Sequence, residues 1–379
     1  MNEHARIAIV GAGLSGLTLA RVLHVNGVPS AIFELDDSPS ARRQGGQLDI
    51  HEDTGQEALR MAGLHEAFLR LVHTGAESSR VLDRNNVLLH ESFDDGTGGR
   101  PEVDRGQLRK LLLDSLPDGT VRWGKKLVDV QPLDDGKHTL RFADGSTATC
   151  DLLVAGDGAW SRIRALVSDA TPAYTGISFI EHYLPDAATR LPACAKVVGD
   201  GALFALAPDH GILAHKENNG SLHIYTAVRA PESWLPSIDF TDAPASKRAV
   251  LAKLAGWAPE LRALVEGAEG PFVPRHLCAL PVGHRWEHKP GVTLLGDAAH
   301  LMSPFAGEGA NLAMFDGAEL GRLLVKHPGD VETAVREYEE AMVLRSTPMA
   351  HESFENLELM FGAETPHALV KLFSGAPPT

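Results

Sequence analysis

Cysteine and long apolar runs are scarce in this chain of 379 residues. Its cysteines, Cys150, Cys194 and Cys278, are far apart and form no CxxC pair, so we expect reduced thiols and neither structural zinc nor another bound metal. No stretch approaches the ~20 apolar residues that span a bilayer. The start at Met1 lacks the basic region and apolar core of a signal peptide. These absences predict a cytoplasmic protein without a membrane partner.

Positive charge is also in short supply. The chain has 35 Lys and Arg residues against 50 Asp and Glu residues, a formal net charge of −15, and no basic run. This balance argues against nucleic acid or an anionic membrane surface as a partner. Apolar residues make up 44% of the chain, and a chain of this length can bury a large core in two lobes. We expect small-molecule partners and a monomer or weak homo-oligomer.

The most informative stretch lies between residues 292 and 324. Val292 to Leu295 is an apolar segment that predicts a strand, Gly296-Asp297 follow as its turn, and residues 310–324 have the apolar spacing of a helix. A carboxylate at such a turn can accept hydrogen bonds from sugar-like hydroxyls. A helix start without bulky side chains can face an anion, because its first N–H groups lack partners. The segment therefore predicts a ligand with a polyol and an anionic ring.

A glycine-rich turn near the N-terminus supplies the other half of such a site. Gly11, Gly13 and Gly16 connect an apolar strand, residues 6–10, to a helix that ends near Asn26. They fit a tight turn, a close approach to pyrophosphate and close helix–strand packing. A second apolar strand, residues 31–33, ends in Glu34, which is suitably placed to bind a ribose 2′-OH. The pattern predicts an adenine dinucleotide; the alternative is a glycine-rich turn with no ligand.

The remaining segments predict two kinds of architecture. Residues 151–155 predict a strand that leads into a turn with Ser161 near a helix N-cap. Residues 56–71 predict one helix, Asp104 predicts the N-cap of another, and residues 79–82 and 87–91 predict a hairpin. From about residue 171, short apolar runs predict an antiparallel sheet with one solvated face. Residues 330–360 predict a long helix.

Together, three segments of the chain resemble the FAD-dependent aromatic hydroxylases, the single-component flavoprotein monooxygenases. That family has a GxGxxG fingerprint, a DGxxSxxR motif and a GDAAHxxxPxxGxGxN motif. All three are intact here, in the family order, and the resemblance covers essentially the whole chain. The second motif is Asp157, Gly158, Ser161 and Arg164, and the third is Gly296, Asp297, Ala298, Ala299, His300, Pro304, Gly307, Gly309 and Asn311.

The resemblance implies an α/β fold. It consists of a Rossmann-like FAD-binding domain of the GR2 type, a second substrate domain built on an antiparallel sheet, and a long C-terminal bridging helix. We expect the discontinuous FAD-binding domain at residues 1–75, 102–170 and 281–325. The substrate domain is expected at residues 76–101 and 171–280, and the helix at residues 330–361.

Within the family, the chain is most similar to the tetracycline-inactivating monooxygenases. The local similarities are residues 45–51, 55–58 and 104–109. In that subgroup the residues that match Asp49 and Arg105 contact FAD, and the residue that matches Arg42 is assigned to the nicotinamide cofactor. The arginine with which the subgroup grips its substrate is missing, because the region before His223 has Gly201-Ala202-Leu203-Phe204. Glu181 stands where the subgroup has a substrate-site glutamine, and His223 matches its substrate-site histidine.

The resemblance, together with the turns above, implies a set of site residues. No side chain is assigned to catalysis, because the flavin carries the chemistry. His300 is expected to orient the loop after Asp297, with direct proton transfer as the alternative. Substrate contacts are expected from Glu181, Leu213 and His223, and a satisfied core histidine is the alternative for His223. Cofactor contacts are expected from Gly11, Gly13, Gly16, Glu34, Arg42, Gly46, Gln47, Asp49, Arg105, Asp157, Asp297, Pro304, Gly307, Gly309, Ala310 and Asn311.

The family chemistry implies tightly bound FAD and transient NADPH or NADH. Reduced nicotinamide gives a hydride to FAD, and reduced flavin captures O2 as a C4a-hydroperoxide. An electron-rich carbon of an aromatic, phenolic or polyketide-like substrate then takes one oxygen atom. Because the subgroup's arginine is missing, we expect tetracycline to be a poor substrate; a tetracycline-like substrate, and with it a role in antibiotic resistance, stays open.

Other functions share parts of this pattern. A flavin-dependent halogenase would carry a WxWxIP segment, whereas the tryptophans here are isolated. A flavin-dependent dehydrogenase or reductase without oxygen insertion is one alternative, and a non-catalytic flavin- or ligand-sequestering protein is another. A disulfide reductase with two dinucleotides is disfavoured, because the sequence has no second GxGxxG after a strand and no CxxC.

Overall fold

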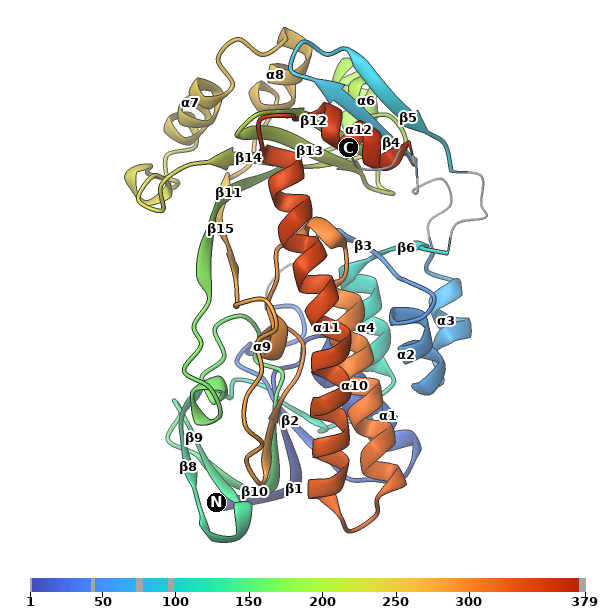
Figure 1. Ribbon diagram of the computed structural model, residues 1–379, viewed down its shortest axis with the longest axis vertical. Coiled ribbons are helices and arrows are strands. Elements are labelled where there is room, and N and C mark those ends of the chain that lie inside the picture. Colours follow the sequence, from blue (N-terminus) through green and yellow to red (C-terminus); the bar gives the residue numbers. More distant parts are fainter. Residues whose placement is uncertain (1, 42–44, 73–77, 95–98, 375–379) are drawn as a thin grey trace. The chain divides into compact units, whose positions relative to one another are not determined.

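The protein, here a computed structural model, consists of two compact units that are each assembled from separate chain segments (Figure 1). The structure describes residues 2–41, 45–72, 78–94 and 99–374. The first unit comprises residues 1–72, 103–173 and 279–353, and the second comprises residues 73–102, 174–278 and 354–379. The assignment of FAD to one domain and of the substrate to the other stays a prediction.

A seven-stranded sheet forms the centre of the first unit. Its order is β7-β2-β1-β10-β9-β8, and β16 also pairs with β10. β1 is parallel to β2 and β10, and β16 is parallel to β10, whereas β8, β9 and β10 are antiparallel. The strands are β1 (Asn2–Val10), β2 (Ala31–Phe33), β7 (Val121–Arg122), β8 (Leu127–Pro132), β9 (His138–Phe142), β10 (Thr147–Ala155) and β16 (Val292–Leu294).

The register of this sheet brings the sequence motifs to one edge. The ends of β1 and β10 pair as Val10 with Ala155, and the ends of β10 and β16 pair as Ala155 with Leu294. Val10 also pairs with Phe33 at the end of β2. The turns that begin at residues 11, 34, 156 and 295 therefore start side by side at the carboxyl edge of the sheet, where open α/β sheets bind ligands.

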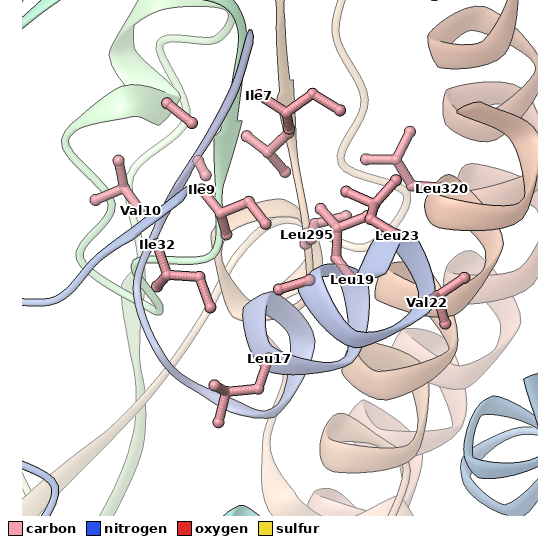
Figure 2. Packing of buried hydrophobic residues seen from close by; sticks show 14 of the residues in the cluster. Ile7, Ile9, Val10, Leu17, Leu19, Val22, Leu23, Ile32, Leu295 and Leu320 are labelled. Atoms are coloured by element: carbon pink, nitrogen blue, oxygen red, sulfur yellow. The ribbon is translucent and has the colours of Figure 1, made fainter. Parts of the chain in front are cut away.

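Two helices pack tightly against each other beside the sheet. α1 (Leu14–Val25) and α10 (Gly309–Lys326) approach so closely that a Cβ atom on Gly317 would lie 2.3 Å from the carbonyl oxygen of Ser15. Figure 2 shows Leu19, Leu23 and Leu320 among the buried side chains of this core. All three are completely buried, so α10 is held in a fixed position relative to β1 and α1.

The prediction of a single helix over residues 56–71 is wrong. Two short helices, α2 (Gly55–Met61) and α3 (His65–Leu69), take its place. Gly63 lies between them with a φ of 67°. The N–H groups of Gly63 and Leu64 donate to the carbonyl oxygens of Arg60 and Leu59, at 3.0 and 2.8 Å. This is the Schellman pattern of a glycine-terminated helix.

The predicted N-cap at Asp104 is confirmed. A two-stranded sheet of β3 (Gln47–Asp49) and β6 (Glu102–Asp104) leads into α4 (Arg105–Asp114). The Asp104 side chain accepts a hydrogen bond from the N–H of Gln107 at 2.8 Å, as expected of a helix N-cap. The unit also contains α9 (Asp297–His300) and the 3₁₀ turns Asp134–Gly136, Ile163–Leu166 and Pro304–Ala306.

The second unit is built on another seven-stranded sheet, with the order β15-β11-β14-β13-β12-β4-β5. Its pairs are antiparallel where β11, β14, β13 and β12 meet, as predicted, but β12 and β4 are parallel. The strands are β4 (Ser79–Asp83), β5 (Leu88–Ser92), β11 (Ala173–Leu184), β12 (Ala202–Ala207), β13 (His210–Lys216), β14 (Leu222–Arg229) and β15 (Val273–Ala279). The helices are α5 (Ala187–Arg190), α6 (Pro192–Val198), α7 (Ala243–Lys253), α8 (Pro259–Glu266) and α12 (His367–Phe373), and Leu235–Ser237 form a 3₁₀ turn.

The prediction that one face of this sheet is solvated is wrong for its central strands. One face packs Ile180, Ile212 and Ile224 into an apolar core. Side chains of the opposite face, such as Leu213 and His223, are also buried. The C-terminal segment of the same unit lies over part of that face, because the Phe361 ring would lie 3.3 Å from a Cβ atom on Gly211 and the rings of Phe204 and Phe373 are 5.8 Å apart.

The long helix predicted near the C-terminus is α11 (Val331–Phe361). Its residues up to Ser353 belong to the first unit and the remainder to the second. In the first unit, the Tyr338 hydroxyl donates to the carbonyl oxygen of Leu294 at 2.9 Å and thereby fixes the helix to the end of β16. Among the described residues, no helix is both long and apolar enough to cross a membrane.

Candidate cofactor and substrate sites

The three positions of the first turn that hold glycine differ in why glycine is needed there. Gly11 has a φ of +105°, and a Cβ atom there would lie 2.2 Å from the carbonyl oxygen of Gly156. A Cβ atom on Gly16 would lie 2.2 Å from the carbonyl oxygen of Gly11. Gly13 has an ordinary φ of −78°, and within the described chain a Cβ atom there would meet only the Gly156 oxygen, at 4.0 Å. The fold itself therefore requires glycine at 11 and 16, whereas at 13 a ligand would be the reason.

Glu34 lies beside this turn. The side chain is buried, with Oε2 accepting from the N–H of Ala12 at 2.6 Å and Oε1 accepting from the N–H of Asp36 at 2.9 Å. An ionised carboxylate has about four acceptor positions, so each oxygen can accept one more hydrogen bond. The arrangement suits a carboxylate that binds a ribose hydroxyl next to the start of α1.

Asp297 projects from a buried turn. Gly296 precedes it with a φ of +55°, and its neighbours Ala298 and Ala299 are completely buried, whereas Asp297 is exposed. The buried Arg164 donates to the carbonyl oxygens of Ala298 and Asp297, at 2.8 and 3.0 Å. The second and third motifs are thus joined by direct hydrogen bonds, and Arg164 fixes the backbone from which the Asp297 carboxylate projects.

His300 has a buried carboxylate partner. Its Nε2 lies 2.6 Å from Oδ2 of Asp316, which also accepts from the N–H of Gly296 at 3.0 Å, and Arg345 donates to Oδ1 at 3.0 Å. Burial alone would lower the pKa of His300, but the Asp316 carboxylate raises the pKa above its usual value. Asp316 thus links His300 to Gly296, so His300 helps to fix the turn before Asp297, whereas its predicted role in orienting the loop after Asp297 stays a prediction.

The N-terminus of α10 is preceded by a short, stiff loop. Pro304 begins the 3₁₀ turn, Gly307 follows with a φ of +70°, and α10 starts at Gly309. A Cβ atom on Gly309 would meet no described atom within 4 Å. The first N–H groups of α10, including that of Ala310, lack partners within the helix, so this end can receive an anionic group.

Asn311 was predicted to contact the cofactor, and its side chain is engaged by the protein backbone. Oδ1 accepts from the N–H of His51 at 2.9 Å, and Nδ2 donates to the carbonyl oxygens of Asp49 and Gly307 at 2.9 and 3.1 Å. Its amide therefore ties the end of β3 to the loop before α10. Any direct contribution to a ligand would come from the backbone N–H group.

A charged group links the same two segments. The ring nitrogens of the buried His51 lie 2.9 Å from Oδ2 of Asp49 and 3.1 Å from Oε1 of Glu308. The predicted cofactor residue Asp49 is thus one end of a carboxylate–imidazole–carboxylate bridge. The sequence analysis assigned no role to His51 or Glu308, although both stand within or next to quoted motifs.

The other predicted cofactor residues near this region are placed as follows. The N–H of Arg105 donates to the carbonyl oxygen of Gly46 at 3.0 Å, so the segment before β3 lies beside the start of α4. Gln47 opens β3, and Arg105 is exposed. Asp157 accepts from the N–H of Arg162 at 3.0 Å, and burial raises its pKa. Arg42 lies outside the described residues.

Arg109 was missed by the sequence analysis. Its buried guanidinium donates to the carbonyl oxygen of Ala12 at 3.0 Å and to that of Pro39 at 3.2 Å. It therefore holds the glycine-rich turn from the side of α4. The sequence did contain a signal, because Arg109 lies within residues 104–109, one of the segments that are similar to the tetracycline-inactivating subgroup.

The predicted substrate residues share one face of the second unit's sheet. The register pairs Glu181 with Tyr225, Leu213 with Tyr225, and Tyr183 with His223. Since side chains of directly paired residues point to the same face, Glu181, Leu213 and His223 lie together on the face opposite the apolar core. His223 stacks on Tyr183, with ring centroids 4.3 Å apart.

Glu181 is paired with two cationic or potentially cationic groups. Its Oε1 lies 2.9 Å from Nε2 of His223, and its Oε2 accepts from Nε of Arg275 at 2.6 Å. Burial would raise the pKa of Glu181, but the hydrogen bonds from His223 and Arg275 lower it to about 2. Arg275, half-exposed on β15, was missed because its contact with Glu181 on the neighbouring strand β11 joins residues that are 94 positions apart and leaves no local pattern in the sequence.

Known proteins are similar to this chain over most of its length. A family described as FAD binding domain matches residues 4–183 and 282–340. The chain is 32% identical over 371 residues to monooxygenase asqM of Emericella nidulans, covering 84% of this chain and 83% of that protein. It is 29% identical over 378 residues to 6-hydroxynicotinate 3-monooxygenase of Pseudomonas fluorescens, covering 94% and 92%.

Among solved structures, the fold is similar to that of the tetracycline destructase Tet(51). The TM-score is 0.73 at 19% sequence identity, and the alignment covers 100% of both chains. At that identity the similarity concerns the fold alone. The family match begins within β1 and ends within α11, and it includes every turn at the carboxyl edge of the first sheet.

Proposed function

Because the chain belongs to the FAD binding domain family and is an FAD-dependent monooxygenase of the aromatic hydroxylase type, we propose that it consumes NADPH or NADH and inserts one oxygen atom from O2 into an aromatic, phenolic or polyketide-like small molecule. Bound FAD supplies the redox chemistry and the activation of oxygen. The protein's part is to hold the cofactor, orient the substrate and exclude water.

The observation that carries this proposal is the arrangement of open helix starts and carboxylates at one sheet edge. Gly13 and Gly309 begin α1 and α10 without any close contact from the described chain at the Cβ position, 4.0 Å being the nearest approach. Glu34 and Asp297 flank them as hydroxyl acceptors. We assign the pyrophosphate to the start of α1, a ribose to Glu34, the ribityl or phosphate side to Asp297, and the flavin ring to the start of α10.

The remaining cofactor assignments follow from these positions. Gly11 and Gly16 shape the first turn, Asp157 lies in the turn after β10, and Asp49 borders Gly307. We assign Gly46, Gln47 and Arg105, which lie where β3 meets the start of α4, to the same cofactor. Pro304 and Gly307 shape the loop before α10, and Ala310 and Asn311 offer backbone N–H groups. We propose that the nicotinamide cofactor binds transiently and contacts Arg42, as the resemblance implies.

We assign substrate recognition to the second unit. Glu181, Leu213 and His223 share a face with Tyr183 and Tyr225, so an aromatic substrate would find stacking partners and hydrogen-bonding groups together. The Glu181 carboxylate is paired with the Arg275 guanidinium at 2.6 Å, so this face carries charged groups beside its aromatic and apolar side chains. All three cysteines are free thiols, which fits the cytoplasm as the proposed compartment.

A screen of purified protein tests the proposal. The protein should be yellow, with one FAD per chain, and a set of hydroxylated aromatics should contain a compound that accelerates NADPH or NADH oxidation. Its product should carry one oxygen atom from O2. NADPH or NADH oxidation with an oxygen-free product would identify a dehydrogenase or reductase. If no compound accelerated the reduction of bound flavin by NADPH or NADH, the protein would be a flavin- or ligand-sequestering protein.

A further inference from the structure

The end of β3 and the start of α10 are joined by two independent links. Asn311 supplies the neutral link, through three hydrogen bonds between its amide and backbone groups of residues 49, 51 and 307. His51 supplies the second link, through its ring contacts with Asp49 and Glu308 at 2.9 and 3.1 Å. The second link is the one that carries charge.

When Asp49 and Glu308 are both ionised, the geometry requires that His51 be an imidazolium. An ionised carboxylate only accepts hydrogen bonds, and a neutral imidazole has one donor nitrogen. Because both ring nitrogens face carboxylate oxygens, both must donate. Burial would lower the pKa of His51, but hydrogen bonds and charge from Asp49 and Glu308 raise it to about 9. Gln56 of α2, whose N–H donates to the His51 carbonyl oxygen at 2.9 Å, is neutral.

The two carboxylates stand where negative charge would interfere with the cofactor. Glu308 immediately precedes α10. Oδ2 of Asp49 would lie 3.0 Å from a Cβ atom on Gly307, so it borders the same loop. A helix N-terminus attracts an anion through its partial positive charge, and two uncompensated carboxylates beside it would cancel that attraction.

The geometry points to His51 as a positioning residue of the FAD site: its charged bridge holds the loop of Gly307 and Glu308 against the end of β3, and it neutralises the two carboxylates so that the start of α10 can stabilise an electron-rich flavin. This inference rests on the proposed FAD site. It concerns the strength and the redox state of cofactor binding, whatever the substrate is.

Substitution of His51 by Gln provides the test, and the chain offers a matched control. His288 also bridges two carboxylates in the first unit, with 2.8 Å contacts to Glu339 and Glu332, but it lies in the segment before β16. Wild type, His51→Gln, His288→Gln and Glu308→Gln would be compared by FAD affinity from flavin fluorescence and by the reduction potential of bound FAD. His51→Gln should bind FAD roughly tenfold or more weakly, in keeping with the loss of hydrogen bonds to charged groups, and its potential should become more negative.

Two further measurements distinguish the effect of the His51 charge from the effect of its shape. In the double variant His51→Gln/Glu308→Gln, part of the lost FAD affinity should return, because one uncompensated carboxylate has been removed. Wild-type FAD affinity should also fall as the pH rises through about 9, and that component should be absent from His51→Gln but present in His288→Gln.

Three results would overturn the inference. They are unchanged FAD affinity and potential in His51→Gln, the same changes in His288→Gln, or additive losses in the double variant. If wild-type protein itself failed to bind FAD, the proposed function and not the role of His51 would be refuted.

Discussion

The guanidinium of Arg164 donates a hydrogen bond to the carbonyl oxygen of Asp297 at 3.0 Å, across 133 positions of the sequence. The same side chain donates to the carbonyl oxygen of Ala298 at 2.8 Å. These bonds make the turn after β16 depend on the turn after β10. The carboxylate expected to bind the cofactor thus projects from a backbone that a second motif holds in place.

Replacement of Arg164 by Met should weaken both the fold and cofactor binding. The substitution leaves the carbonyl oxygen of the buried Ala298 without its donor, at a cost of roughly 1–3 kcal/mol. Urea unfolding of the FAD-free protein should show the lower free energy of unfolding, and an FAD titration should show weaker binding. An unchanged unfolding midpoint would contradict the structural role assigned to Arg164.

Alanine substitutions at Gly11 and Gly13 should separate folding from binding. Gly11→Ala places a Cβ atom 2.2 Å from the Gly156 oxygen and should destabilise the protein strongly. Gly13→Ala meets the described chain only at 4.0 Å, so its thermal stability without FAD should match wild type while FAD affinity falls. If Gly13→Ala bound FAD as wild type does, the pyrophosphate would not lie at the start of α1.

Asp297→Asn should weaken FAD without unfolding the protein. The side chain is exposed in the structure, so its loss removes a ligand contact and no packing. A hydrogen bond to a charged group is worth roughly 1.5–3 kcal/mol. Its loss corresponds to a dissociation constant for FAD that is about 10- to 150-fold larger. The exposed Asp118 provides the control, since Asp118→Asn should retain wild-type affinity. Equal FAD retention in all three proteins would show that the motif is misassigned.

Tetracycline should be a poor substrate. The arginine of the tetracycline-inactivating subgroup is absent from residues 201–204, and Arg275 is already engaged by Glu181. A site whose polar partners do not match the substrate discriminates strongly, because buried groups are left unpaired. Steady-state kinetics with tetracycline and a set of hydroxylated aromatics would decide. The highest kcat/KM for tetracycline would refute the argument from the missing arginine.

The sequence predicted the turns at the carboxyl edge of the first sheet well, because the signals for these turns are local. Strand, glycine turn and helix follow one another at Gly11, and strand, acidic turn and helix follow one another at Asp297. Parallel strands then bring their carboxyl ends together without further information. The same reasoning located α11 and the N-cap at Asp104, since both depend on spacing within a few turns.

What the sequence did not predict depends on contacts between distant segments. His51 meets Glu308 across 257 positions, and Arg275 meets Glu181 across 94. No periodicity encodes such pairs. The wrong prediction of one helix over residues 56–71 has a different cause. Gly63, which ends the first helix, was present in the sequence, but the apolar spacing around it was given more weight. The buried second face of the sheet escaped prediction because Phe361 and Phe373 come from the far C-terminal segment.

Isotopically labelled O2 shows whether the protein inserts oxygen into its substrate. Purified protein with FAD, NADPH or NADH and its best aromatic substrate would be supplied with isotopically labelled O2, and the product would be weighed by mass spectrometry. The product should carry one labelled oxygen atom for each nicotinamide oxidised in coupled turnover. A product whose oxygen comes from water, or one with no added oxygen, would contradict the proposed function.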